Sequence, residues 1–235
     1  MSEVKVLSGG AAAAVVKDVQ EQFERATGAR VNGTFSAVGQ MRDQLLAGAA
    51  CDLVILTRPL VNQLVASGHV VEGSQRSLGL VRTGIAVRTG DALPALSGRE
   101  ELAAAFRAAS ETYYPDPEKA TAGIHFMSVL KALALDQALK AALRPFPNGA
   151  AAMAEMARSH AARVIGCTQE TEINYTPGVT LVGSLPQEFE LATDYTLGVC
   201  THARDPQLAH QLAELVAGPA SEAIRRQGGF TFSAR

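Results

Sequence analysis

The sequence predicts an α/β protein of two lobes, in which mainly parallel strands alternate with helices. Short apolar runs alternate with segments whose apolar residues recur at helical spacing, the order typical of parallel sheets. Two long apolar segments, 78–88 and 189–201, interrupt this alternation and enclose a second set of strands and helices. With 235 residues, the chain is long enough to form two small cores. The chain is therefore expected to leave one lobe, build a second and return.

The first strand and helix of lobe one have the clearest pattern. A strand is expected at 4–7, and a helix at 11–26, because apolar residues recur at spacing four from Val15 to Phe23. Gly28 is expected to end this helix, since glycine readily adopts the left-handed conformation found after helix ends.

Two further strand–helix pairs complete the first half of lobe one. A strand at 31–35 precedes a helix at 38–47. The run at 51–56 is apolar almost throughout, as in a central strand buried on both faces. Pro59 lies near the start of the next helix, where proline is favoured, and Gly68 ends it.

The segment between the two long apolar runs is expected to form lobe two. Its elements are a helix at 98–109, a strand at 111–114, helices at 122–134 and 149–161, and strands at 163–168 and 179–182. Helices at 205–216 and 219–226 follow the return to lobe one. Residues 1–82 and 196–235 are assigned to lobe one and 83–195 to lobe two. The two crossing strands are expected to form a hinge, and the cleft between the lobes to hold a ligand.

Small residues gather at three predicted helix starts, each after a strand. A helix start has unpaired N–H groups and the positive end of the helix dipole. Small residues let a ligand approach these groups, and a Ser or Thr hydroxyl adds a donor. The sequence therefore predicts a site for a small anion. The clusters are Ser8-Gly9-Gly10, Ser36-Ala37-Val38 and Thr121-Ala122-Gly123.

Composition and motifs disfavour several other function classes. A net charge of −2 without a basic patch argues against a nucleic-acid partner, and the apolar runs are too short for membrane insertion. No GxGxxG or P-loop indicates a nucleotide cofactor, so no cofactor is expected. No metal is expected either, because Glu170 and Glu172 lie at strand spacing without a His partner.

The N-terminus and the cysteines indicate the cellular compartment in which the protein is expected. Residues 1–3 lead directly into a strand without a leader, so a cytoplasmic location is expected for the chain as given, or a periplasmic one if a signal peptide was removed. Cys51, Cys167 and Cys200 each lie in an apolar strand candidate, and they are expected to be buried, reduced thiols.

The order and spacing of these motifs resemble the type II periplasmic binding proteins, and within them the molybdate-binding branch. The matching stretches are 7–10, 35–40, 47–55, 114–123 and 181–186. The resemblance implies a two-lobe fold that binds a small anion, a carboxylate or an oxyanion. In molybdate binders, Ser hydroxyls and backbone amides at the first two helix starts hold the oxyanion. Ser8 and Ser36 occupy these positions, and Ala122-Gly123 matches the amides of lobe two. An ABC transporter is implied as a partner only if a secreted form exists.

One segment departs from the molybdate branch, which typically has a Tyr as a direct oxyanion contact before the last strands of lobe two. Here the segment 165–173 reads Ile-Gly-Cys-Thr-Gln-Glu-Thr-Glu-Ile. Its Thr-Glu-Ile pattern looks closer to a subgroup that includes aconitate isomerase, which shifts a proton and a double bond within a tricarboxylate. Two hypotheses therefore stand: an anion-binding protein, and a cofactor-independent isomerase of a small polycarboxylate.

Two side chains are the candidates for moving the proton in such an isomerase. Glu172 could act as a general base, with burial raising its pKa, or it could be a solvated carboxylate or a neighbour of a helix start. His125 lies in the first turn of a helix, where the dipole favours the neutral ring, and it could carry a proton or pack beside Phe126. Thr168 is a candidate ligand contact in the same segment.

Three further charged residues are candidates for ligand or structural contacts. Arg42 and Arg58 follow helix or strand ends, and each could pair with a ligand carboxylate or remain solvated. Asp52 is expected to be structural and to accept hydrogen bonds from nearby backbone amides.

Overall fold

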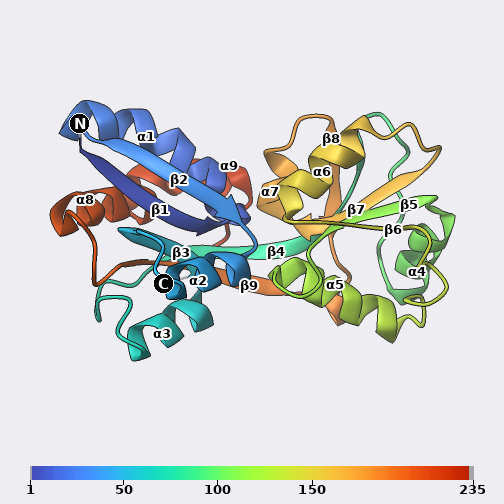
Figure 1. The fold of residues 1–235 in the computed structure, drawn as a ribbon. Helices are drawn as coiled ribbons and strands as arrows, with labels where there is room; N and C mark the ends of the chain where they lie inside the picture. Colours follow the sequence, from blue (N-terminus) through green and yellow to red (C-terminus); the bar gives the residue numbers. More distant parts are fainter. Residues whose placement is uncertain (1, 233–235) are drawn as a thin grey trace. The chain divides into compact units, whose positions relative to one another are not determined.

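The chain folds into two compact units in a computed structural model that describes residues 2–232 (Figure 1). Unit 1 comprises the chain up to Val81 and from Thr193 onward, and unit 2 comprises Arg82–Ala192. The chain leaves unit 1 within β4 (Arg76–Arg88) and returns at the start of β9 (Ala192–Val199). The two crossing strands expected near these positions are therefore present.

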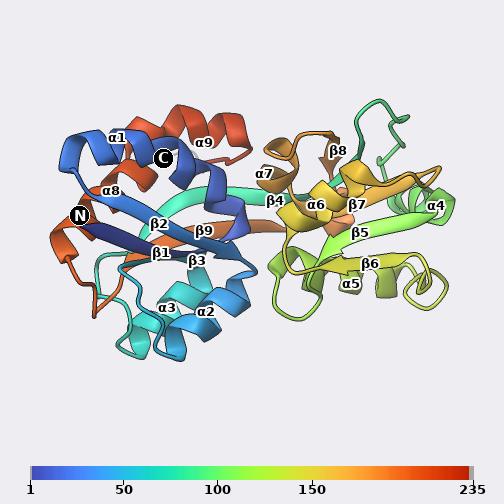
Figure 2. The same ribbon diagram turned by 45° about the horizontal axis from the view of Figure 1, so that its top comes forward.

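Unit 1 is a sheet with helices on both faces. Its strands follow the order β2-β1-β3-β9, in which β1 pairs in parallel with both β2 and β3, and β9 runs antiparallel to β3. Helices α1, α8 and α9 cover one face and α2 and α3 the other (Figures 1 and 2). The bounds are β1 (Glu3–Gly9), η1 (Gly10–Ala12), α1 (Ala13–Thr27), β2 (Arg30–Ser36), α2 (Val38–Leu46), β3 (Leu53–Thr57), α3 (Arg58–Ala66), α8 (Pro206–Ala217), η3 (Pro219–Ser221) and α9 (Glu222–Gly228).

The local sequence explains these elements well. Val15, Val19 and Phe23 of α1 are buried in the core of unit 1, as their spacing predicts. Gly28 follows α1 with φ 70°, the left-handed conformation that glycine adopts without steric cost. Every residue of β3 is buried, which confirms the expectation of a central strand.

Unit 2 is built around a second sheet, in the order β4-β7-β5-β6, with β8 also paired with β4. Strands β5, β6 and β7 are mutually parallel, and β4 runs antiparallel to β7 and β8. One core cluster joins the sheet to α4 and α5, and another joins it to α6. The bounds are α4 (Arg99–Ala108), β5 (Glu111–Pro115), α5 (Thr121–Ala132), β6 (Leu143–Phe146), α6 (Gly149–Arg158), β7 (Val164–Gln169), α7 (Glu170–Asn174), β8 (Val179–Ser184) and η2 (Gln187–Phe189).

Three elements of unit 2 were not predicted, and the spacing assigned to Glu170 and Glu172 was wrong. Strand β6, the short helix α7 and the 3-10 helix η2 have no counterpart in the expected elements. Glu170 and Glu172 were expected at strand spacing on one face, but both lie in α7. A helix rotates each residue by about 100°, so residues two apart point in different directions.

Within residues 2–232, no helix is both long and apolar enough to cross a membrane.

Candidate functional site

The first two small-residue clusters lie next to each other in unit 1. Strands β1 and β2 pair in parallel so that Gly9 lies opposite Ser36, and η1 and α2 begin just beyond these residues. The residues before the two helices, Gly9 and Ala37, provide no side-chain cap. In contrast, Asp205 accepts a hydrogen bond from the Leu208 amide at the start of α8. The first amides of η1 and α2 therefore have no side-chain partner at the cap position.

The serines of these clusters are buried, and their hydroxyl groups have partners. The Ser8 hydroxyl donates to the Gly9 carbonyl oxygen at 2.9 Å, and the Ser36 hydroxyl donates to Gln40 Oε1 at 2.7 Å. Gln40, the partner of Ser36, is half-buried. Gly9 also has a packing role, since a Cβ there would lie 2.6 Å from Val38 Cγ1.

The third cluster opens α5 in unit 2. Ala120 precedes the helix and provides no side-chain cap. Ala122 and Gly123 are buried, and Thr121 is half-buried. A Cβ on Gly123 would lie 2.2 Å from the Asp116 carbonyl oxygen, so only glycine lets α5 approach the end of β5 this closely.

His125 connects α5 to η2. Its Nε2 lies 2.8 Å from the Phe189 carbonyl oxygen. Because a carbonyl can only accept, Nε2 carries a proton and donates it to this contact. His125 therefore has a structural contact at Nε2.

Glu172 lies at the start of another helix. Its Oε2 accepts a hydrogen bond from the Thr168 hydroxyl at 2.6 Å, and the carboxylate also accepts from the backbone amides of Gly149, Ala150 and Gln169. The Gln169 contact is the return half of a capping box on α7, and the other two amides belong to the first turn of α6. Glu172 therefore lies next to a helix start, which is one of the structural roles that the sequence allowed for it.

The electrostatics of Glu172 combine burial with many donors. Burial raises the pKa of Glu172, while the hydrogen bonds from Thr168 and the three amides partly offset this rise. The site is also tight, because a Cβ on Gly149 would lie 2.0 Å from both Glu172 Oε2 and Thr168 Oγ1. Thr168 itself is fully buried and faces Glu172. The catalytic role of Glu172 and the ligand contact of Thr168 stay predictions, and both side chains have structural partners.

Gln169 and Thr171, which lie within three residues of Glu172 in the chain, were not among the site residues predicted from the sequence. Both polar atoms of the Gln169 amide, and the Thr171 hydroxyl, are buried without a hydrogen-bond partner among the described residues. Thr83, opposite Gln169 in the β4–β7 pairing, has an unpartnered hydroxyl as well. Buried amides normally have partners, so these side chains mark a polar region at the carboxyl end of β7. The sequence feature that could have indicated these residues is the glutamine that follows the apolar run of the predicted strand at 163–168.

The remaining charged candidates have partners within unit 1. Arg42 pairs with Asp43, and Arg58 pairs with Asp194. The Asp52 carboxylate accepts from the Lys5 amide at 2.7 Å and from the Arg204 amide at 2.6 Å. This confirms the structural role expected for Asp52.

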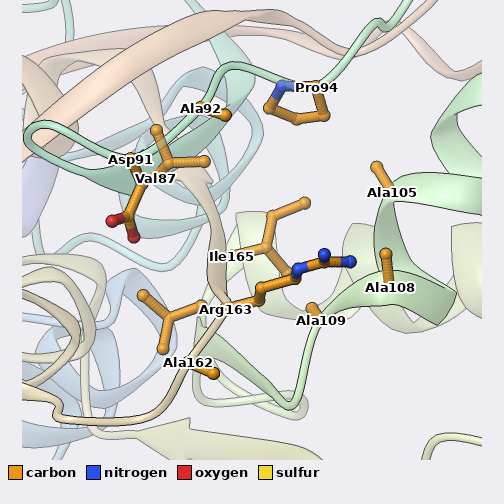
Figure 3. Close-up of a pocket in the computed structure, with 11 residues that line it drawn as sticks. Val87, Asp91, Ala92, Pro94, Ala105, Ala108, Ala109, Ala162, Arg163 and Ile165 are labelled. Atoms are coloured by element: carbon orange, nitrogen blue, oxygen red, sulfur yellow. The ribbon is translucent and has the colours of Figure 1, made fainter.

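Unit 2 also has a hollow at the amino end of β7, the end opposite to α5 and α7 (Figure 3). It encloses about 270 Å³ and is lined mainly by small apolar side chains, with the Arg163 side chain extending toward α4. None of the predicted site residues lines it. Within the described residues, no group of three or more His, Cys, Asp and Glu side chains could hold a metal ion.

Comparisons with known proteins agree with this architecture. A model of the family described as bacterial extracellular solute-binding protein matches residues 4–231. An aconitate isomerase from a Pseudomonas species is 26% identical over 237 residues, covering 97% of this chain and 87% of that protein.

Solved structures extend the likeness to the whole fold. The periplasmic molybdate-binding protein of Azotobacter vinelandii superposes with a TM-score of 0.80 at 18% identity, covering 98% of this chain and all (100%) of that one. A sulfate-binding protein of Mycobacterium tuberculosis gives 0.73 at 15% identity, covering 99% of this chain and 88% of that one. The two-lobe periplasmic-binding-protein fold expected from the sequence is thereby confirmed.

Proposed function

Since the chain belongs to the bacterial extracellular solute-binding protein family, we propose that it binds a small anion, a carboxylate or an oxyanion. The observation that carries this proposal is a pair of helix starts with small residues, each following the end of a strand. Ala37 and Ala120 leave the first amides of α2 and α5 without a side-chain cap, and the small residues Ser36 and Gly123 lie beside them. Uncapped amides at a helix start are a general anion-binding arrangement. The molybdate-binding and sulfate-binding proteins of similar fold support the same class of ligand.

The proposed contacts are assigned for each unit separately. In unit 1, the anion accepts from the first amides of α2, and the Ser36 hydroxyl turns from Gln40 to the ligand. In unit 2, the first amides of α5 offer an anion the same kind of contact. An exported form of the protein would deliver its ligand to an ABC transporter.

The polar side chains at the end of β7 favour a carboxylic acid as the ligand over a bare oxyanion. The Gln169 amide offers one donor group and one acceptor, both unpartnered, and the Thr171 hydroxyl offers another of each. A fully deprotonated oxyanion only accepts hydrogen bonds, so it would leave the Gln169 oxygen unpaired. An organic acid that also carries a hydroxyl or a protonated carboxyl would satisfy both, and an unpaired buried group costs roughly 1–3 kcal/mol.

A thermal-shift screen tests the proposal directly. Molybdate, tungstate and sulfate are compared with cis-aconitate, trans-aconitate and citrate, at concentrations up to the millimolar range. A ligand at a hundred times its dissociation constant stabilises the fold by about 2.7 kcal/mol, which such a screen detects. Stabilisation by citrate, the acid in this set that carries a hydroxyl group, is the expected result. Stabilisation by molybdate or tungstate alone would contradict the assignment of Gln169, and no stabilisation by any anion would contradict the proposal.

The variant Ala37→Asp separates binding from folding. A carboxylate at this cap position would accept from the first amides of α2, as Asp205 does at α8, and would fill the anion site. The variant is expected to keep or gain thermal stability while losing most of the ligand-induced shift. Ser67→Ala, which removes a hydroxyl at the end of α3, is the matched control and should retain the shift.

A second function, isomerisation of a small polycarboxylate, is favoured by one specific observation. The relative that is 26% identical over nearly the whole chain is an aconitate isomerase. In this alternative we assign the proton transfer to His125 through its Nδ1 atom, since Nε2 contacts the Phe189 carbonyl oxygen. Glu172 is the weaker candidate, because four hydrogen-bond donors already surround its two oxygens.

Proton NMR in heavy water tests the alternative. An isomerase would interconvert cis- and trans-aconitate with uptake of deuterium from the solvent. His125→Gln should then lower the rate at least 100-fold, the usual contribution of a general acid or base, while the surface variant His210→Gln should leave it unchanged. Binding of aconitate without any exchange would exclude the isomerase and leave the binding function standing.

A further inference from the structure

Two of the three cysteines lie side by side in unit 1. Cys51 comes two residues before β3, and Cys200 directly follows β9. Strands β3 and β9 pair antiparallel, with Leu53 opposite Val199, so these two ends of the strands meet. The Cys200 amide donates to the carbonyl oxygen of Asp52 at 2.9 Å, which places Cys200 against the neighbour of Cys51 in the chain.

The two thiols share one buried environment. Both belong to the core cluster of unit 1, with exposed fractions of 6% for Cys51 and 3% for Cys200. A hydrogen bond with Cys51, together with burial, raises the pKa of the Cys200 thiol. Cys51 Sγ also lies 3.2 Å from the Leu53 carbonyl oxygen. In the folded, reduced protein the two thiol groups are therefore in contact with each other.

We propose that Cys51 and Cys200 form a disulfide bond when the chain folds in an oxidising compartment. Disulfides persist in extracellular and periplasmic proteins and are rare in the reducing cytosol. Because both sulfurs are buried once unit 1 is formed, the exchange takes place during folding, while the thiols are still accessible.

The oxidant is a small disulfide, such as oxidised glutathione. The thiolate of one cysteine attacks it, forms a mixed disulfide and releases one molecule of glutathione thiol. The second cysteine then attacks the mixed disulfide at the protein sulfur, forms the Cys51–Cys200 bond and releases the second glutathione thiol. Two protein thiols are oxidised and one disulfide is reduced, and the two protons pass to the released thiolates.

The bond would have a specific structural effect. The segment between Cys51 and Cys200 contains all of unit 2, Arg82–Ala192. The crosslink therefore joins the two stretches of chain that together build unit 1, on either side of the inserted unit. A disulfide that closes such a long loop restricts the unfolded chain strongly and so stabilises the folded one.

Refolding of the full chain tests the inference. The protein is unfolded in urea with dithiothreitol and refolded with reduced and oxidised glutathione, or with dithiothreitol alone. After the glutathione refolding, a thiol assay in denaturant should count one free thiol of the three in the chain, and peptide mass mapping should join Cys51 to Cys200. The thermal midpoint should rise by about 5–15 °C and return on reduction.

Three single variants make the assignment specific. Cys51→Ser and Cys200→Ser should each abolish the rise in the thermal midpoint, whereas Cys167→Ser, a buried thiol in unit 2, should keep it. The thiol count of the wild-type chain does not depend on how well the variants fold. Three free thiols after glutathione refolding, or a disulfide that includes Cys167, would overturn the inference.

Discussion

At the scale of single residues, Glu172 contributes to stability through the groups that it satisfies. Its carboxylate accepts from the Thr168 hydroxyl and from the amides of Gly149, Ala150 and Gln169. Glu172→Ala leaves these donors buried without an acceptor, and we expect a loss of roughly 3–5 kcal/mol in unfolding free energy. Urea unfolding measures it. Glu155→Ala, which replaces a half-buried glutamate in α6, should change stability by about 0.5 kcal/mol or less. Similar losses in both variants would contradict the role assigned to Glu172.

Glu170 predicts a pH dependence of stability. Burial raises its pKa above the ordinary value of 4.5, while the bond from Ser184 and the charge of Arg82 offset part of the rise. The folded chain therefore binds the proton of the Glu170 carboxyl more tightly than the unfolded chain does. The resulting contribution to the unfolding free energy is fully present below about pH 4.5 and is lost as the pH rises through the folded-state pKa.

The variant Glu170→Gln cannot ionise, so it should lack this part of the pH dependence. As the pH rises from 4.5 to 7, the unfolding free energy of the wild type should therefore fall relative to that of the variant. Urea midpoints taken at intervals across this range measure the difference. Parallel stability curves for the two proteins would show that Glu170 keeps its ordinary pKa.

At the scale of elements, α5 depends on a glycine in its first turn. A methyl group at Gly123 would lie 2.2 Å from the carbonyl oxygen of Asp116, a backbone atom that cannot rotate away. Gly123→Ala should therefore cost about 1–3 kcal/mol, although Gly→Ala inside a helix usually gains about 1 kcal/mol. Gly98→Ala, at the start of α4, is the control because a methyl group there meets nothing within 4 Å. Equal stabilities, measured by thermal unfolding, would contradict the close approach of α5 to β5.

The elements also show what a sequence can and cannot predict. Strong periodicity and a glycine stop were sufficient for α1, and a continuous apolar run was sufficient for β3. Strand β6 was missed because Arg144 and Pro145 interrupt its pattern. The strand tolerates a proline because it lies at the edge of the sheet, paired with β5.

The candidate site was less predictable than the fold. The small-residue helix starts could be located, because strand ends and helix starts are local features. The partners of Glu172 could not be identified, since two of them begin α6, more than twenty residues away in the chain. The spacing of Glu170 and Glu172 is compatible with a strand or a helix, and only the structure shows the helix α7.

At the scale of the whole molecule, unit 2 has the properties of an inserted domain. Its two ends lie together, because the Thr83 amide donates to the Leu191 carbonyl oxygen at 3.0 Å. It also has its own core on each face of its sheet. Inserted domains with adjacent ends are commonly able to fold alone.

A fragment of residues 82–192 should therefore fold without the rest of the chain. Far-UV circular dichroism should show mixed helix and strand, and urea should unfold the fragment in one cooperative transition. A shorter fragment, 82–160, is the control: it lacks β7, which pairs with both β4 and β5, and should stay unfolded because the sheet loses its central strand. If 82–192 shows no cooperative transition, the cores of unit 2 are not sufficient, and its stability must depend on the chain segments that form unit 1.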